Sequence, residues 1–234
     1  MSEILSNNVN MQYAEGDFLA ERLKGFTTNR AYLSGYLEEK FQFSHTNHGY
    51  KFYRSVLRVP RLSGIDDHIP IMISDDIAQY KTLAQMEKGE FIEVDGRFTS
   101  YNEQGEDGKR HLSLYLYASV LNGEIPEEEQ CIQRRNFIFL NGTICKSPIF
   151  RRTPLGKQIL DLMVAVNRKY GRADYIPCIA WGTVAERYSL QFEIGSEICL
   201  WGRMQSRTYT KRLESGVSEK RITREVSIMR IIEE

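Results

Sequence analysis

The chain has 234 residues, 41% of them hydrophobic and 26% charged, which is the balance of an ordinary soluble globular protein. No apolar run approaches the roughly 18 residues of a membrane-spanning helix, and residues 1–16 lack the basic and then apolar pattern of a signal peptide. We therefore expect a cytoplasmic protein. The net charge of zero argues against a nucleic-acid binder until its distribution along the chain is considered.

The two parts of the chain carry opposite charge. Residues 1–130 contain 13 basic and 21 acidic residues, a net charge of −8. Residues 131–234 contain 18 basic and 10 acidic residues, a net charge of +8. This asymmetry predicts two domains with different partners.

An internal repeat supports the same division. With an offset of 107 residues, Asn29–Leu37 falls on Asn136–Ile144, and Asp67-His-Ile-Pro70 falls on Asp174-Tyr-Ile-Pro177. After a one-residue deletion, Gly96-Arg97 falls on Gly202-Arg203. Chance would not give these matches in order with one gap, so the halves are predicted to share one fold.

In chain order, residues 1–25 are predicted to be an N-terminal arm, 26–121 a first, acidic domain, 122–135 a linker and 136–234 a second, basic domain. The first domain is predicted to hold its helix near Asp76–Met86. In the second, the apolar patterns and turn residues predict strands Asn136–Cys145, Gln158–Asn167 and Tyr175–Trp181, a helix Gly182–Phe192, and strands Glu197–Gln205 and Ile222–Ile232.

That order of elements is typical of the OB-fold, a five-stranded, partly open barrel. The fold class is therefore predicted to be mainly all-β, with two tandem OB-fold barrels and one short helix in each. The unpaired spacing of Cys131, Cys145, Cys178 and Cys199 predicts reduced, partly buried thiols rather than disulfides.

The second domain carries a specific motif set. It comprises Asn136-x-x-x-Leu140-Asn-Gly142, Thr153-Pro-x-Gly156-Lys157, Val164-Ala-Val-Asn-Arg168, Asp174-Tyr-Ile-Pro-Cys-Ile-Ala-Trp-Gly182 and Gly202-Arg-Met-Gln-Ser-Arg207-x-Tyr209. These residues strongly resemble the bacterial single-stranded DNA-binding protein family. The resemblance implies an OB barrel that coats single-stranded DNA during replication, repair and recombination. It also implies an assembly of four OB domains, which a tandem chain would reach as a homodimer.

Binding of an unpaired strand needs aromatic faces for bases and cations for phosphates. The family pattern implies stacking roles for four aromatic residues, Tyr170, Tyr175, Trp181 and Tyr209. Core packing is the alternative, and it is strongest for Trp181 because a strand alternates its faces. Trp201 stays open between solvent, a subunit interface and the groove.

Basic residues accompany these rings in segments that are predicted to be loops. The predicted phosphate-binding residues are Arg151, Arg152, Lys157, Arg168, Lys169, Arg172, Arg203, Arg207, Lys211 and Arg212. Of these, Arg207, Lys211 and Arg212 are expected in a long loop between strands four and five. A solvated charged surface is the alternative, but cations interleaved with rings favour nucleic-acid contact.

The first domain lacks this signature. The positions matching Trp181 and Tyr175 are Ser74 and His68, and the loop Asn102–Gly108 carries three acids. We expect the first domain to bind DNA weakly or not at all and to serve assembly or recruitment, with Tyr101, Arg97 and Lys51 as minor contacts. A protein-interaction module of a replication or recombination complex is thus the alternative function.

Catalytic and metal-binding motifs give little support to an enzyme. His45 and His48 lack further ligands nearby, and Asp66-Asp67 and Asp75-Asp76 are interpreted as capping or solvated acids rather than as a nuclease metal site. No phosphate-binding glycine loop, nucleophile elbow or HExxH motif occurs. We expect no enzymatic activity, no cofactor and no metal.

Overall fold

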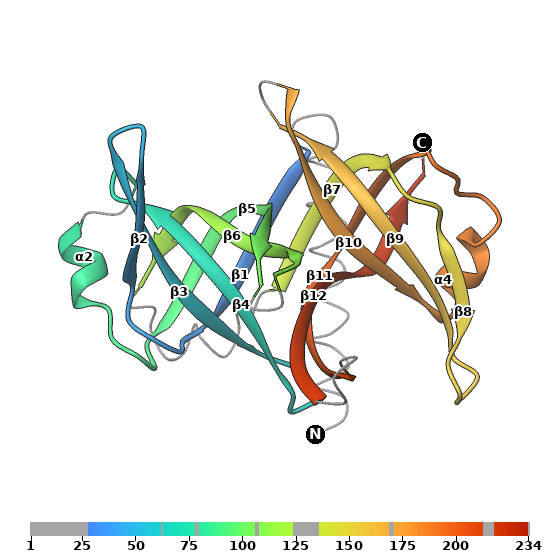
Figure 1. Ribbon diagram of the computed structural model, residues 1–234, viewed down its shortest axis with the longest axis horizontal. Coiled ribbons are helices and arrows are strands. Elements are labelled where there is room, and N and C mark those ends of the chain that lie inside the picture. Colours follow the sequence, from blue (N-terminus) through green and yellow to red (C-terminus); the bar gives the residue numbers. More distant parts are fainter. Residues whose placement is uncertain are drawn as a thin grey trace, which may run out of the picture.

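The computed structural model describes residues 28–61, 63–77, 80–105, 108–123, 136–168, 171–212 and 218–233. The predicted arm 1–25 and residues 124–135 of the predicted linker lie outside the described residues. The described elements form two β-barrels that lie next to each other (Figure 1).

The first barrel contains six strands and a short helix among its described residues. They are β1 (Asn29–Leu37), β2 (Gln42–Asn47), β3 (Tyr50–Pro60), β4 (Asp66–Ser74), α2 (Tyr80–Gln85), β5 (Phe91–Gln104) and β6 (Arg110–Asn122).

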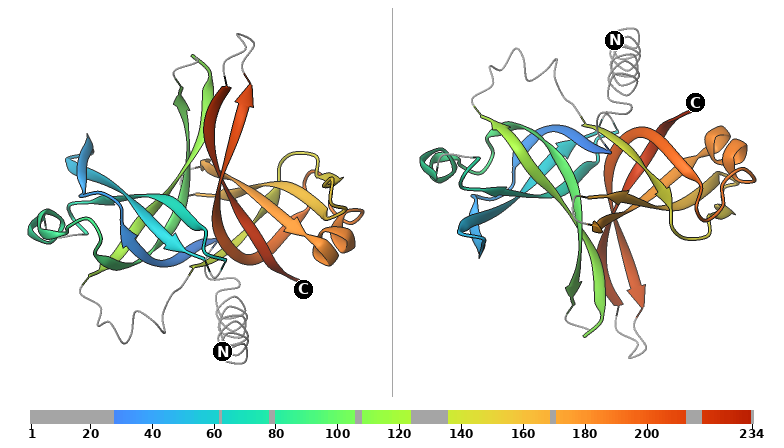
Figure 2. Two further views of the ribbon diagram at one scale, coloured as in Figure 1. Left: turned by 90° about the horizontal axis from the view of Figure 1, so that it is seen from below. Right: turned by 90° about the horizontal axis from the view of Figure 1, so that it is seen from above.

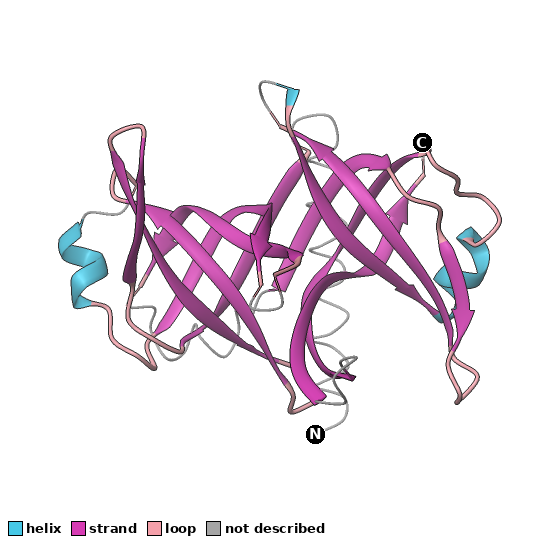
Figure 3. Ribbon diagram, in the orientation of Figure 1, coloured by secondary structure: helices cyan, strands magenta, loops and turns pink. Residues whose placement is uncertain are grey.

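The second barrel repeats this order. Its elements are β7 (Asn136–Ile144), β8 (Ile149–Arg152), β9 (Gln158–Asn167), β10 (Ala173–Trp181), α4 (Gly182–Tyr188), β11 (Glu197–Arg212) and β12 (Ser218–Ile232). Strands dominate both halves (Figure 3), so the predicted tandem OB fold is confirmed. The short strands β2 and β8 are additions to the five strands predicted for each barrel.

Within the described residues, all strands join one continuous sheet in the order β2-β3-β4-β6-β5-β1-β7-β11-β12-β10-β9-β8. Each barrel closes because its first strand pairs twice, β1 with β5 and β3, and β7 with β11 and β9. Gly142 permits this double pairing, since a Cβ there would lie 2.5 Å from the carbonyl oxygen of Ala165.

Apolar residues that alternate along the strands fill the barrels. Leu33, Phe98 and Leu116 of the first barrel and Leu140 and Val164 of the second are completely buried. Their neighbours in the strands point to the outside, because successive side chains of a strand point to opposite faces. The outer faces of the barrels are therefore free to carry chemistry without disturbing the core.

The two barrels are joined strand to strand. β1 and β7 pair antiparallel from Asn29↔Leu140 to Leu33↔Asn136, which makes the sheet continuous across the molecule. Asn29 and Asn136 each add a reciprocal pair of side-chain bonds, to the backbone of Phe98 and of Met204 respectively. The repeat in the sequence thus corresponds to a pseudo-twofold arrangement.

Two long hairpins, β5–β6 of the first barrel and β11–β12 of the second, leave the barrels on the same side of the molecule (Figure 2). β11 and β12 pair from Cys199↔Ile232 to Arg212↔Ser218. The prediction ended the fourth strand at Gln205 and began the fifth at Ile222, with a long loop between them. That loop was wrong over 206–212 and 218–221, because the polar residues there continue the ladder of backbone hydrogen bonds beyond the apolar core.

The helices are shorter than predicted. α4 ends at Tyr188 rather than at Phe192, and the Ser189 hydroxyl donates to the carbonyl of Glu186 at this end. Phe192 nevertheless stacks on Tyr188, with ring centroids 5.2 Å apart, so the apolar spacing reflected a real contact. No described helix has the length and apolar character to cross a bilayer.

Candidate nucleic-acid interface

The outer face of β10 presents two of the predicted stacking residues. Tyr175 is 46% exposed, whereas its neighbour Ile176 points into the core and is completely buried. Trp181 ends β10 and is half-buried, with the ammonium nitrogen of Lys157 4.9 Å from its ring centroid. A predicted stacking ring and a predicted phosphate-binding cation therefore meet at this site in a cation–π contact.

A row of exposed residues follows the outer face of β11. Arg203 and Arg207 are exposed and are separated by buried residues such as Met204, and Tyr209 lies further along the strand, where Thr208 and Thr210 are exposed as well. Tyr209 is 41% exposed. Gln205 interrupts the row, since it is buried and donates to Glu225 at 3.0 Å. The result is a line of two cations and a ring on a rigid strand rather than on a loop.

Strand β12 lies between the strands that carry these residues. Cys178 of β10 is opposite Val226 of β12, and Val226 is opposite Met204 of β11. The pairing of β10 with β12 does not extend to Tyr175, whose backbone N–H donates to the Ser100 hydroxyl of the first barrel instead. The rings of β10 and the row on β11 are therefore separated by one strand on the outside of the second barrel.

Other predicted cations have acidic partners or different surroundings. Arg151 in β8 donates from Nε to Asp161 at 2.6 Å, and this hydrogen bond raises the pKa of the Arg151 guanidinium. Arg152 and Arg172 are exposed. The carboxylate of Asp161 reduces the charge that Arg151 offers to a phosphate.

Four of the predicted residues are not placed as side chains. Lys169 and Tyr170 lie outside the described residues, and of Lys211 and Arg212 the structure describes the backbone within β11 only. Their predicted roles stay predictions.

Arg168 also has a structural role, which the sequence did not indicate. It is 22% exposed and pairs with Asp174, and the same nitrogen donates to the carbonyl of Ser100 in the first barrel at 3.3 Å. Asp174 also accepts from the backbone N–H of Ser100, and the Ser100 hydroxyl accepts from the N–H of Tyr175. Arg168 therefore helps to hold the two barrels together beside Tyr175.

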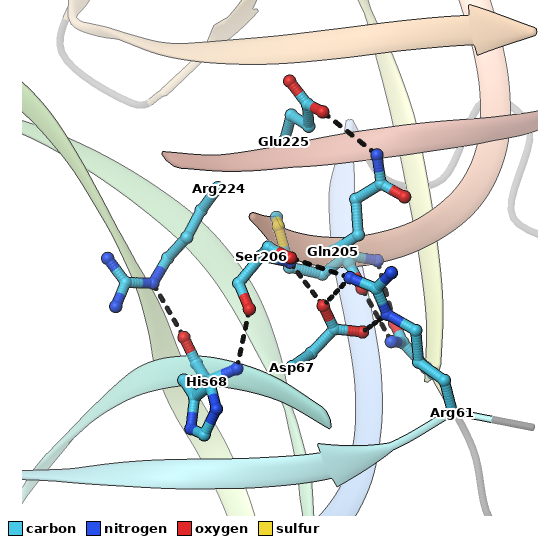
Figure 4. A network of polar contacts seen from close by, with 9 residues as sticks. Arg61, Asp67, His68, Gln205, Ser206, Arg224 and Glu225 are labelled. Atoms are coloured by element: carbon cyan, nitrogen blue, oxygen red, sulfur yellow. Dashed lines mark hydrogen bonds and ion pairs between the residues drawn. The ribbon is translucent and has the colours of Figure 1, made fainter. Parts of the chain in front are cut away.

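The pseudo-twofold equivalent of this network lies on the other side of the junction (Figure 4). Asp67 is completely buried, pairs with Arg61 and accepts from the backbone N–H of Ser206. The Ser206 hydroxyl accepts from the N–H of His68 at 2.9 Å. Asp67 is thus a structural residue of the junction, and its interpretation as a capping or solvated acid was wrong.

The repeat contains a signal that predicts both networks. Arg61 and Asp67 match Arg168 and Asp174 at the offset of 107 residues, and Ser100 matches Ser206 at 106. Polar residues that recur at equivalent positions of two otherwise divergent halves indicate a shared structural task. Their partners lie in the opposite barrel, which no local pattern reveals.

Trp201 is a packing residue. It is buried against Phe139 and Ile232, and it stacks on Phe137 with ring centroids 6.1 Å apart. Of the alternatives that the sequence left open, the position in a DNA-binding groove is not supported. The three described cysteines are free thiols.

The first barrel has lost the stacking residues at the equivalent positions. Ser74, which matches Trp181, is buried, and its hydroxyl donates to Asp76. His68, which matches Tyr175, bonds through Nδ1 to Glu38 at 2.8 Å. Both positions therefore hold polar side chains, as the sequence predicted, and both side chains have polar partners.

The fold and the shared sheet define the chain as a tandem OB-fold protein. A family described as the "Single-strand binding protein family" matches residues 135–231. Single-stranded DNA-binding protein B of Bacillus subtilis is 34% identical over 89 residues, which cover 36% of this chain and 77% of that protein. The chain belongs to the bacterial single-stranded DNA-binding protein family, as its motifs predicted.

Two Thermus proteins match over a longer stretch. The single-stranded DNA-binding protein of Thermus thermophilus is 27% identical over 160 residues, which cover 62% of this chain and 59% of that protein. The crystal structure of the Thermus aquaticus protein superimposes with a TM-score of 0.65 at 20% identity, covering 88% of this chain and 92% of that one. This structural likeness confirms the fold.

Proposed function

We propose that the chain binds single-stranded DNA with little sequence preference, as a non-catalytic protein of DNA replication, repair or recombination in the cytoplasm. The observation that carries this proposal is the outer face of the second barrel. Tyr175 and Trp181 lie on β10, Lys157 contacts the Trp181 ring, and the exposed row Arg203, Arg207 and Tyr209 lies on β11. Membership of the family supports the same ligand.

The chemistry suits an unpaired strand. Every base has an aromatic face, so stacking on Tyr175, Trp181 and Tyr209 does not depend on sequence. Arg203 and Arg207 precede Tyr209 on β11 and are exposed, so they would meet phosphates of a strand that stacks on Tyr209. A duplex keeps its base faces covered and is expected to bind much more weakly.

A titration of fluorescent oligo-dT at two salt concentrations tests the proposal. Affinity should fall as salt rises, with a log–log slope of about 0.7 for each phosphate contacted, because binding releases counterions. A duplex of the same length is the control. Absence of binding at low salt, or equal affinity for the duplex, would contradict the proposal.

The acidic first barrel favours a second candidate function. Residues 1–130 carry a net charge of −8, of which residues 26–121 account for −2 with 11 basic and 13 acidic residues. This excess of acids suits a protein-interaction or assembly module of a replication or recombination complex. In that case DNA binding would be weak at every salt concentration, and pull-down with the intact chain would recover a protein partner.

We also propose that two chains associate as a homodimer. The resemblance implies an assembly of four OB domains, and the tandem chain supplies two of them. A homodimer would provide the remaining pair.

A further inference from the structure

A group of tyrosines lies on the outer face of the first barrel, where the family pattern gave no stacking residues. Tyr115 and Tyr117 are two residues apart on β6 and share one face, while the alternating residues Leu114 and Leu116 point into the core. Tyr101 on β5 contacts Tyr115 edge to face, with ring centroids 5.9 Å apart, and is 39% exposed.

These rings are not required by the barrel itself. Thr99↔Tyr115 on β5–β6 corresponds to Gln205↔Glu225 on β11–β12, and Arg97↔Tyr117 corresponds to Arg203↔Ser227. The second barrel therefore has Glu225 and Ser227 where the first has Tyr115 and Tyr117. The positions of Trp181 and Tyr209 are conversely Ser74 and Glu103 in the first barrel. The first barrel thus carries aromatic residues on its outer face at other positions than the second barrel does.

Cations accompany the tyrosines of the first barrel. Arg97 is exposed, with its guanidinium carbon 5.5 Å from the ring centroid of Tyr117. Arg168 of the second barrel lies 6.0 Å from the centroid of Tyr101. Arg54 on β3 is also exposed, and it pairs across the sheet with Met72, which is level with Tyr117. One acidic residue also contacts these rings: the carboxylate of Glu103 accepts a hydrogen bond of 2.8 Å from the Tyr115 hydroxyl.

The surface continues that of the second barrel. The backbone N–H of Tyr175 donates to the Ser100 hydroxyl at 2.8 Å, and Tyr101 is the next residue along β5. The exposed rings Tyr175 and Tyr101 thus flank the junction, with Arg168 between their strands. A strand that leaves the second barrel at Tyr175 would reach Tyr101 and then Tyr117.

Building on the proposed function, we propose that Tyr101, Tyr115 and Tyr117 with Arg97 form a second single-stranded DNA subsite, which extends the strand from the second barrel across the junction. By itself this subsite is weak, in keeping with the three acids of the adjacent segment Asn102–Gly108. It contributes because a strand that is already bound next to it is present at a high effective concentration.

The test uses the intact chain with Tyr101→Ala and Arg97→Ala combined, and with Tyr101→Phe and Arg97→Lys combined as the matched control. Oligo-dT of about 10 nucleotides fits one barrel and about 30 nucleotides spans both, since an OB fold covers about 4–16 nucleotides. The alanine variant should lose about 5- to 100-fold in affinity for the long oligonucleotide only. The control variant, which keeps the ring and the cation, should bind both lengths as the unmodified chain does.

Photo-crosslinking provides a readout that does not depend on stability. A long oligonucleotide substituted with iododeoxyuridine should crosslink to Tyr101 or Tyr117 as well as to the second barrel. Crosslinks confined to the second barrel, equal loss on both lengths, or no loss on either would overturn the subsite and leave the tyrosines to another ligand. Failure of the unmodified chain to bind any oligonucleotide would instead refute the proposed function.

Discussion

The ring of Trp181 is in contact with a cation. Lys157 lies 4.9 Å from the ring centroid, so a stacking base would have to displace the ammonium group. The displaced Lys157 would then be free to meet the phosphate of the same nucleotide. One contact of the free protein would then supply both a ring and a charge to a bound strand.

Replacement of Trp181 and Tyr209 by alanine tests the stacking role. The double variant should bind oligo-dT more weakly by about 2–4 kcal/mol, because each stacked base contributes about 1–3 kcal/mol. Fluorescence titration measures the loss, and circular dichroism checks the fold. The variant with phenylalanine at both positions is the control, and it should retain most of the affinity. Unchanged affinity in a folded alanine variant would place the site elsewhere.

The buried carboxylate of Asp67 gives a prediction for stability. Asp67→Ala would leave Arg61 and the backbone N–H of Ser206 without their acceptor at the junction. Removal of one member of a buried ion pair costs about 3–5 kcal/mol, so urea unfolding should show a loss near the lower end of this range.

The neighbouring residue is the matched control. Asp66 pairs with Arg58 at 3.0 Å, but both side chains are about a third exposed. Asp66→Ala should therefore cost less than about 1 kcal/mol. Equal losses for the two variants would contradict the structural role assigned to Asp67.

At the scale of strands and hairpins, the sequence predicted the core of the fold well. The strand Gln158–Asn167 was correct at both ends, since a turn with Thr153, Pro154 and Gly156 precedes it. The outer parts of β11 and β12 were missed because Arg207–Arg212 and Ser218–Arg221 have no apolar face to mark a strand. Pairing between the two arms, rather than burial, keeps them extended.

The same limit applies to the candidate site. The family motifs singled out Tyr175, Trp181 and Arg207 as candidates for DNA contact, but neither the motifs nor the repeat showed that Arg168 and Asp174 bond to Ser100 of the other barrel. They also left the role of Trp201 open. Contacts between barrels depend on how the β1 and β7 edges meet, which is not encoded in any short segment.

A bulge in β11 provides a prediction at this scale. The register shifts between Trp201 and Gly202, and a Cβ on Gly202 would lie 2.3 Å from the carbonyl oxygen of Ser227. Gly202→Ala should therefore destabilise the protein by about 1–3 kcal/mol through overpacking. Gly123→Ala is the control, because its Cβ would meet only the end of the flexible Met86 side chain, at 3.1 Å. Thermal unfolding of the two variants measures the difference.

For the whole molecule, the proposed homodimer can be tested by sedimentation. Velocity runs should give twice the mass of one chain, and addition of a long oligo-dT should produce one faster species rather than a mixture. A chain that sediments as a monomer at micromolar concentration would contradict the dimer, and its DNA binding could then be assessed independently.

The strand pairing between β1 and β7 has a consequence for evolution. Because one polypeptide encodes both barrels, each side of the junction can change on its own while the pseudo-twofold contacts of Asp67 and Asp174 stay matched. Identical subunits cannot do this, since every mutation appears in all copies at once. Gene fusion of two barrels would thus have allowed one half to become acidic and the other basic without loss of their partnership.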